Sequence, residues 1–273
     1  MTKKIRPKIG LALGSGGSRG LAHIGVLEIL EKNNIPIDYI AGSSIGAVVG
    51  GIYAATQDTK LLKQIFTSNS WKQIFNLLTD FSGLTGGLIN GRKLADFLKK
   101  SLSAENFNDL LIPFAAVATD IETGETKILD KGDFISAIQA SFSIPLLFKP
   151  LRREGKVLVD GGLTQPVPVR TVRKMGADIV IAVNLDKCIR QPKKYKNPHI
   201  PLLLGPMLDI ARFHLAEKDS LLADIIISPK LNDSSLLGIE NFLDGKDFIT
   251  TGARATANKI PLLQKIIRQK NEL

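Results

Sequence analysis

Ser44 is the residue whose surroundings point most directly to chemistry. It stands at the centre of Gly42-Ser43-Ser44-Ile45-Gly46, which has the form G-x-S-x-G. Tyr39 and Ile40 are typical of the end of a short buried strand, and the small apolar run 47–55 is typical of a buried helix. A sharp turn between strand and helix lifts a serine hydroxyl above the sheet edge, where it can act as a nucleophile. Taken alone, the motif also fits an ordinary tight turn in a chain rich in glycine and serine.

A glycine-rich loop precedes Ser44. Residues 8–13 predict a buried strand, the loop Gly14-Ser15-Gly16-Gly17-Ser18-Arg19-Gly20 follows, and apolar residues at helical spacing come next. A strand, a glycine loop and a helix N-terminus together form an anion site, because free N–H groups point outward there. A dinucleotide-binding loop has the form G-x-G-x-x-G, but Arg19 stands at the sixth position. An oxyanion-binding loop needs adjacent small residues, and Gly16 and Gly17 supply that pair.

A serine nucleophile needs a base that accepts its proton. The chain has three histidines, His23, His199 and His214. We expect His23 to pack within the first helix, and neither of the others follows the short, glycine-punctuated loop that delivers a base to a sheet edge. Asp160 is the better candidate, because it ends a predicted strand and Gly161-Gly162 follows it. Desolvation would raise the pKa of its carboxyl toward a value useful for a base. The alternative is that Asp160-Gly161-Gly162 forms only a turn.

Three motifs in this order resemble those of the patatin-like phospholipase family. They are the glycine loop 14–20, the serine motif 42–46 and the Asp-Gly-Gly motif 160–162. The resemblance extends through 23–27, 118–120, 123–124, 141–145 and 166–168, so it covers the chain from about Ile9 to Asn184. Beyond this it is looser and most similar to the small bacterial members.

The resemblance implies a serine acyl hydrolase that uses a Ser–Asp dyad and an acyl-enzyme. Ser44 would attack the ester carbonyl, and Asp160 would take the proton and return it to the leaving alcohol. The backbone N–H groups of Gly16, Gly17 and Ile45 would form the oxyanion hole. Arg19 would stabilise the loop or neighbouring carbonyls, with contact to a lipid phosphate as the alternative. The other motif positions that support the site are Gly14, Gly20, Gly42, Gly46, Gly161 and Gly162.

The implied activity is that of a serine esterase, either a phospholipase A or a lysophospholipase, acting on a lipid ester. No cofactor or metal ion is expected. Two alternatives stay open. The chain could be a peripheral membrane or regulatory protein with a weak or vestigial hydrolase site, or a phosphate- or dinucleotide-binding module that uses the first glycine loop.

The fold class follows from strands that alternate with helices along the 273 residues, 44% of which are hydrophobic. This pattern predicts a three-layer α/β sandwich with a central, mostly parallel sheet flanked by helices. We expect one domain over 1–273, with the core motifs in 9–184 and a looser C-terminal part in 185–273. Cys188 is the single cysteine, which excludes an internal disulfide and fits a reducing compartment.

The net charge of +10 indicates an anionic partner, with ordinary solubility as the alternative. We expect a membrane surface in this role and no nucleic acid. The basic loop 187–196 and the apolar cluster around Trp71 are candidate contacts. The simplest interpretation of the first is a solvated loop, and an apolar helical face such as the second is more often part of the core. No apolar run approaches the ~20 residues that a membrane span needs, and the run after the basic N-terminus is too short for a signal peptide. The expected location is the cytoplasm, peripheral at the inner face of the membrane.

Overall fold

The computed structural model describes residues 6–68, 91–145, 147–187, 200–231 and 246–272. Residues 69–90 and 188–199, which include Trp71, Cys188, His199 and most of the basic loop 187–196, lie outside the described residues.

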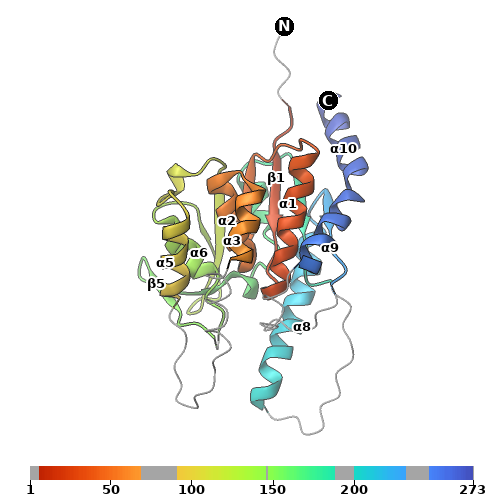
Figure 1. The fold of residues 1–273 in the computed structure, drawn as a ribbon. Helices are drawn as coiled ribbons and strands as arrows, with labels where there is room; N and C mark the ends of the chain where they lie inside the picture. The colour runs from red at the N-terminus through yellow and green to blue at the C-terminus, as the bar shows by residue number, and fades with distance from the viewer. Residues whose placement is uncertain (1–5, 69–90, 146, 188–199, 232–245, 273) are drawn as a thin grey trace.

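A mixed eight-stranded sheet forms the centre of the described chain, in the order β5-β6-β3-β2-β1-β7-β8, with β4 also paired to β3 (Figure 1). Strands β1, β2, β3, β7 and β8 pair in parallel, β4 and β6 run antiparallel to β3, and β5 runs antiparallel to β6. The strands are β1 (Ile9–Leu13), β2 (Tyr39–Ser43), β3 (Phe114–Asp120), β4 (Thr126–Leu129), β5 (Leu151–Arg153), β6 (Lys156–Asp160), β7 (Ile179–Val183) and β8 (Ile225–Ile227).

Helices cover both faces of the sheet. The α-helices are α1 (Ala22–Lys32), α2 (Ile45–Thr56), α3 (Thr59–Thr67), α5 (Arg92–Ser101), α6 (Phe134–Ser141), α7 (Val169–Lys174), α8 (Ile200–Ser220), α9 (Lys246–Ala257) and α10 (Ile260–Glu272). Short 3-10 helices are η1 (Gly17–Leu21), η2 (Phe107–Asp109) and η3 (Gly161–Leu163).

Successive side chains of the central strands point to opposite faces of the sheet, and this alternation explains the layers. In β1, Leu11 and Leu13 belong to a large apolar cluster that includes the buried residues of α1 and α2. Ala12, which points to the opposite face, belongs to a second cluster with buried residues of α7 and α8. Because successive side chains of a strand point to opposite faces, a strand buried on both sides must be apolar throughout. The expected three-layer α/β sandwich is therefore confirmed.

Helix α9, the last helix but one, packs directly on α1 (Figure 1). Glycines at the contact let the two backbones approach. A Cβ atom at Gly25 would lie 1.9 Å from the carbonyl oxygen of Ile249, and one at Gly252 would lie 2.1 Å from that of Ala22. Residues near the end of the chain thus complete the same apolar layer as the first helix.

Strand β3 sets the place of the candidate site. Ser43 pairs with Val117 in the parallel β2–β3 ladder, and Asp160 pairs with the next residue, Ala118, in the antiparallel β6–β3 ladder. Strand β4 pairs with both Val117 and Ala118, so it occupies the opposite edge. Hence β2 and β6 lie end to end along one edge of β3. The end of β6 meets the end of β2 in space.

Strand β2 also runs further than the sequence predicts. It continues through Gly42 to Ser43, whereas the apolar pattern places its end at Ile40. Gly42 and Ser43 are weak strand formers, but Gly42 pairs with Leu13 of β1 and Ser43 with Val117 of β3. Pairing on both sides therefore overrides the local preference and carries the strand up to Ser44.

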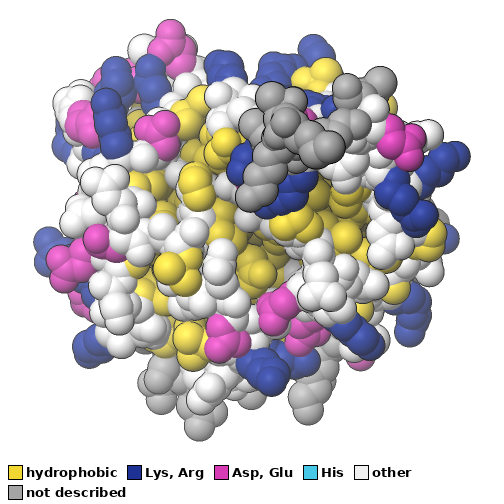
Figure 2. Space-filling model, turned by 90° about the horizontal axis from the view of Figure 1, so that it is seen from above, with side chains coloured by type: hydrophobic (Ala, Val, Ile, Leu, Met, Phe, Trp, Pro, Cys, Tyr) yellow, Lys and Arg dark blue, Asp and Glu magenta, His cyan; other side chains and the backbone are white. Residues whose placement is uncertain are grey.

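Charge does not gather into a single basic face at one end of the molecule. Figure 2 shows Lys and Arg side chains interspersed with Asp and Glu around the end seen from above, with hydrophobic side chains between them. This is the end that carries the N-terminal region in Figure 1, away from the lower part of α8.

Candidate active site

Ser44 occupies a sharp turn between β2 and α2. Its backbone has φ 56° and ψ −125°, a conformation with positive φ that is costly for a residue with a side chain. Glycines make the turn sterically feasible. A Cβ atom at Gly42 would lie 2.4 Å from the Cα of Ala47, and one at Gly46 would lie 2.2 Å from the carbonyl oxygen of Leu13. The backbone N–H of Ser44 donates to the Oγ of Ser141 at 3.0 Å, which fixes the turn.

Asp160 reaches Ser44 from the end of β6. The Ser44 hydroxyl donates to Oδ2 of Asp160 at 2.5 Å, and the N–H of Gly162 donates to Oδ1 at 2.7 Å. The backbone N–H of Asp160 donates to the carbonyl oxygen of Ser143 at 2.9 Å. Gly161 has no room for a side chain, because a Cβ atom would lie 2.1 Å from the carbonyl oxygen of Val117. Both oxygens of the carboxylate are thus held in place.

Burial changes the acidity of Asp160. Desolvation disfavours the charged carboxylate and raises its pKa to about 6. The hydrogen bonds from Ser44 and Gly162 and the positive charge of Arg212 act in the opposite direction and limit the rise. At neutral pH the carboxylate is ionised and can accept a proton, and its basicity exceeds that of an ordinary aspartate.

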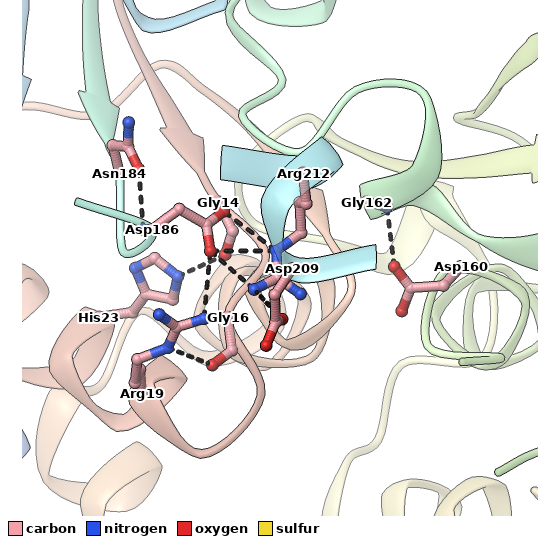
Figure 3. Close-up of polar contacts among 10 residues, drawn as sticks. All are labelled: Gly14, Gly16, Arg19, His23, Asp160, Gly162, Asn184, Asp186, Asp209 and Arg212. Atoms are coloured by element: carbon pink, nitrogen blue, oxygen red, sulfur yellow. Dashed lines mark hydrogen bonds and ion pairs between the residues drawn. The ribbon is translucent and has the colours of Figure 1, made fainter. Parts of the chain in front are cut away.

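The glycine-rich loop is held by hydrogen bonds on successive residues (Figure 3). The Nε2 atom of His23 lies 2.8 Å from the carbonyl oxygen of Gly14, and Nε of Arg19 donates to the carbonyl oxygen of Gly16 at 3.0 Å. The N–H of Ser15 donates to the carbonyl oxygen of Pro166 at 2.8 Å. Because the C=O and N–H of one peptide point in opposite directions, the bond to Gly16 also fixes the N–H of Gly17.

Neither histidine that the structure describes contacts the Ser44 hydroxyl. His23 is buried on α1, and burial lowers the pKa of its imidazole to about 4, with the contact to Gly14 opposing the change. His214 is exposed on α8 and packs edge-on against Phe213, with ring centroids 5.2 Å apart. The hydroxyl of Ser44 is paired with a carboxylate instead.

A family model described as patatin-like phospholipase matches residues 11–173, more than half of the chain. The chain belongs to the patatin-like phospholipase family. The matched stretch contains Ser44, Asp160 and the whole glycine loop.

Relatives and solved structures agree with this membership. The chain is 37% identical over 194 residues to an uncharacterized NTE family protein of Mycobacterium tuberculosis, covering 71% of this chain and 53% of the relative. It is 33% identical over 193 residues to lysophospholipase NTE1 of Candida glabrata, and this match covers 68% of this chain and 11% of that relative. It therefore spans about half the length of the first relative and a small part of the second. VipD from Legionella pneumophila has the same fold, with a TM-score of 0.56, 14% identity, and coverage of 93% of this chain and 66% of that structure.

A pocket opens beside the Ser–Asp pair of this patatin-like chain. Its polar wall includes Ser44, Asp160, Ser15 and Arg212. The apolar wall is formed by Ile144, Pro145, Leu163, Leu208, Ala211 and Leu215. The last three lie on α8, so a helix beyond the matched stretch forms one side of the pocket. Among the residues that the structure describes, no group of three or more His, Cys, Asp or Glu is arranged to hold a metal ion.

A buried ion network joins α8 to the glycine loop (Figure 3). Asp186 accepts from Arg19 at 3.1 Å and from Nη2 of Arg212 at 2.8 Å, and all three side chains are less than 10% exposed. Asp209 also contacts Arg212, at 3.1 Å, and the side chain of Asn184 accepts from the N–H of Asp186 at 2.9 Å. Arg19 thus connects the Gly16 carbonyl to a carboxylate that also anchors α8.

Asp186 and Arg212 are site residues that the sequence analysis does not identify. The available signal for Asp186 is its position just after the apolar run 177–184, which is typical of a buried strand, because side chains emerge at the sheet edge where such a strand ends. Arg212 has no comparable signal, because an arginine on a helix with a mixed pattern is usually exposed.

We predict that Asp186→Asn lowers the free energy of unfolding by about 3 kcal/mol, because it leaves two buried guanidinium groups without their shared carboxylate. Urea unfolding followed by circular dichroism measures this change. Asp209→Asn is the matched control and should cost less, because Asp209 contacts only one of the two arginines in the Asp186 network and its side chain is more exposed, at 15% against 3%. Equal unfolding midpoints for Asp186→Asn and the unchanged chain would contradict the assignment.

Proposed function

We propose that this chain is a serine acyl hydrolase that cleaves carboxylic esters of phospholipids or lysophospholipids through a Ser–Asp dyad. The hydrogen bond of 2.5 Å between the Ser44 hydroxyl and the Asp160 carboxylate carries the proposal. Ser44 lies on a strained strand-to-helix turn, and a pocket with an apolar wall opens beside it. Membership of the patatin-like phospholipase family and the likeness to lysophospholipase NTE1 support a lipid ester as the substrate.

The reaction begins when the Ser44 oxygen attacks the ester carbonyl carbon. The Ser44 proton passes to Asp160 Oδ2, a new C–O bond forms, and the carbonyl electron pair moves to the oxygen. When the tetrahedral intermediate collapses, the bond to the leaving alcohol breaks and that oxygen takes the proton from Asp160. Water then attacks the acyl-enzyme by the same route and releases the fatty acid.

The oxyanion hole is assigned to backbone N–H groups of Gly16, Gly17 and Ile45. Gly16 and Gly17 stand at the start of η1, and Ile45 is the first residue of α2. The first N–H groups of a helix have no partner within that helix, so they can donate to an anion, and the helix dipole adds to the attraction. Removing one such donor typically costs about 10²–10³ in rate.

The alternatives have less support. A phosphate- or dinucleotide-binding module would use the glycine loop, but it gives no role to the bond between Ser44 and Asp160. A membrane or regulatory protein with a vestigial site keeps the geometry without the reaction. A fluorophosphonate probe separates this case, because it labels only a serine that is activated as a nucleophile.

We predict that Ser44→Ala abolishes hydrolysis of a short p-nitrophenyl ester and that Asp160→Asn lowers kcat by about 10²–10⁴, the usual range for loss of a general base. His199→Ala and His214→Ala should keep the activity of the unchanged chain. Initial rates with purified, folded variants provide the measurement. Retained activity in Ser44→Ala would falsify the assignment of the nucleophile, and loss in a histidine variant would argue for a histidine base.

The pKa of Asp160 predicts a pH profile. The base must be unprotonated in the free enzyme, so kcat/KM should be half its maximum near pH 6, level off at higher pH, and approach a tenfold fall per pH unit at lower pH. Asp219 offers a matched control, because burial raises the pKa of its carboxyl to about 6 as well, while it does not line the pocket. Asp219→Asn should therefore keep the acidic limb at the same pH. Movement of the limb in Asp219→Asn, or a limb below pH 5, would contradict the role of Asp160.

We further propose that the enzyme works at a membrane surface through α8. Met207 and Ile210 on this helix are 61% and 48% exposed, and they adjoin the pocket residues Leu208 and Ala211. Exposed apolar side chains on the helix that forms one wall of the pocket favour insertion among acyl chains, and the net charge of +10 attracts anionic headgroups. In the described part of the chain, no helix has the length and apolar character to cross a bilayer.

We predict that Met207→Glu/Ile210→Glu weakens binding to phosphatidylglycerol–phosphatidylcholine vesicles at least about tenfold, since burying one such side chain contributes roughly 1.5–3 kcal/mol. Hydrolysis of a soluble short ester should be unchanged. Leu262→Glu is the matched control, because Leu262 is 45% exposed but lies on α10, at the other end of the molecule in Figure 1. Sedimentation at low and high salt separates the contribution of charge, which salt screens. Equal losses in both variants would contradict a role specific to α8.

A further inference from the structure

Ser15 carries a buried hydroxyl whose hydrogen-bonding capacity is unused. The residue is 2% exposed, and within the described part of the chain its Oγ has no hydrogen-bond partner. Buried hydroxyl groups are nearly always hydrogen-bonded, since an unpaired one has lost its contacts with water and gained none in return. Such a group calls for a partner that arrives from outside the chain.

The position of Ser15 indicates which partner this is. The residue lines the pocket together with Ser44 and Asp160. It precedes Gly16 directly, so its hydroxyl belongs to the same loop as the proposed N–H donors. The hydroxyl also lies against Gly162, where an added Cβ atom would be 3.2 Å from Oγ of Ser15, and Gly162 is the residue whose N–H holds Asp160.

The backbone around Ser15 is fixed. Its N–H donates to the carbonyl oxygen of Pro166, and the preceding residue Gly14 is held by Val183 through its N–H and by His23 through its carbonyl oxygen. Only rotation of the side chain remains. A donor that needs no backbone rearrangement to meet a developing charge is the kind that stabilises a transition state.

Ser43 shows that a buried hydroxyl without a partner does not by itself mark a residue that can meet a ligand. Its Oγ is also buried and has no partner among the described residues, and it is next to Ser44 in the chain. However, Ser43 does not line the pocket. Its hydroxyl lies against Gly161, where an added Cβ atom would be 2.9 Å away. Ser15 and Ser43 therefore form a natural pair for comparison.

We propose that the Ser15 hydroxyl donates a hydrogen bond to the oxyanion of the tetrahedral intermediate, as a side-chain donor beside the N–H groups of Gly16 and Gly17. The inference rests on the proposed acyl-hydrolase function. Ser15 keeps its own proton throughout: the proton of Ser44 passes to Asp160 and then to the leaving alcohol, while the Ser15 O–H only stabilises the charge on the former carbonyl oxygen. When the carbonyl re-forms, this bond weakens.

Ser15→Ala tests the proposal with a soluble short ester. Because the bond forms in the transition state, kcat should fall about 10²-fold with little change in KM. An alkyl trifluoromethyl ketone, which forms an oxyanionic adduct with an activated serine, should bind more weakly by a similar factor. Binding of an ether analogue of the substrate, which forms no oxyanion, should not change. If Ser15→Ala is insoluble, Ser15→Gly removes the same hydroxyl.

Ser43→Ala is the control and should keep the kcat of the unchanged chain, because its hydroxyl does not face the pocket. The proposal is overturned if Ser15→Ala keeps full kcat while Ser44→Ala is inactive, or if Ser15→Ala and Ser43→Ala lose activity equally. It is also overturned if the ketone binds Ser15→Ala as tightly as the unchanged chain. Failure of the proposed function gives a different result, because Ser44→Ala would then be as active as the unchanged chain. That result would remove the basis for the proposed function and for the role of Ser15 alike.

Discussion

The site depends on the way two strands share one edge of β3. Strand β2 pairs with β3 up to Val117, and β6 begins its pairing at Ala118, so consecutive residues of one strand hold the ends of two others. Ser44 and Asp160 are separated by 116 positions in the chain and still form a hydrogen bond of 2.5 Å. The glycines at 42, 46 and 161 serve this junction, because a side chain at any of them would collide with backbone atoms.

The junction costs stability at two points. Ser44 has a positive φ, which typically costs about 1–3 kcal/mol, and Asp160 places a carboxylate where burial disfavours its charge. The surrounding structure supports both. Ser141 fixes the turn, Gly162 binds the carboxylate, and the apolar layers on both faces of the sheet hold the strands. Together they place a nucleophile in the pocket lining beside a carboxylate that is more basic than usual.

Local sequence was enough to predict that strands alternate with helices, because buried strands and amphipathic helices differ in period. It also indicated Ser44 and Asp160, whose glycine neighbours mark turns at strand ends. It did not indicate Asp186, Arg212 or Ser15. The roles of these residues come from partners far along the chain, and a charged or hydroxyl side chain has no local sign of burial. The extension of β2 to Ser43 was missed for the same reason, because its pairing partners decide it rather than its own residues.

The two halves of the site differ in their relation to the family. The Ser–Asp pair and the glycine loop lie within residues 11–173, which the family model matches, whereas Asp186, Arg212 and the α8 wall of the pocket lie beyond them. Asp186 connects the halves, because it binds Arg19 on the loop and Arg212 on the helix. A change in the packing of α8 therefore acts on the loop through one carboxylate. The Ser–Asp pair and the glycine loop come from the matched stretch together with one apolar wall of the pocket, and α8, outside that stretch, forms the facing wall.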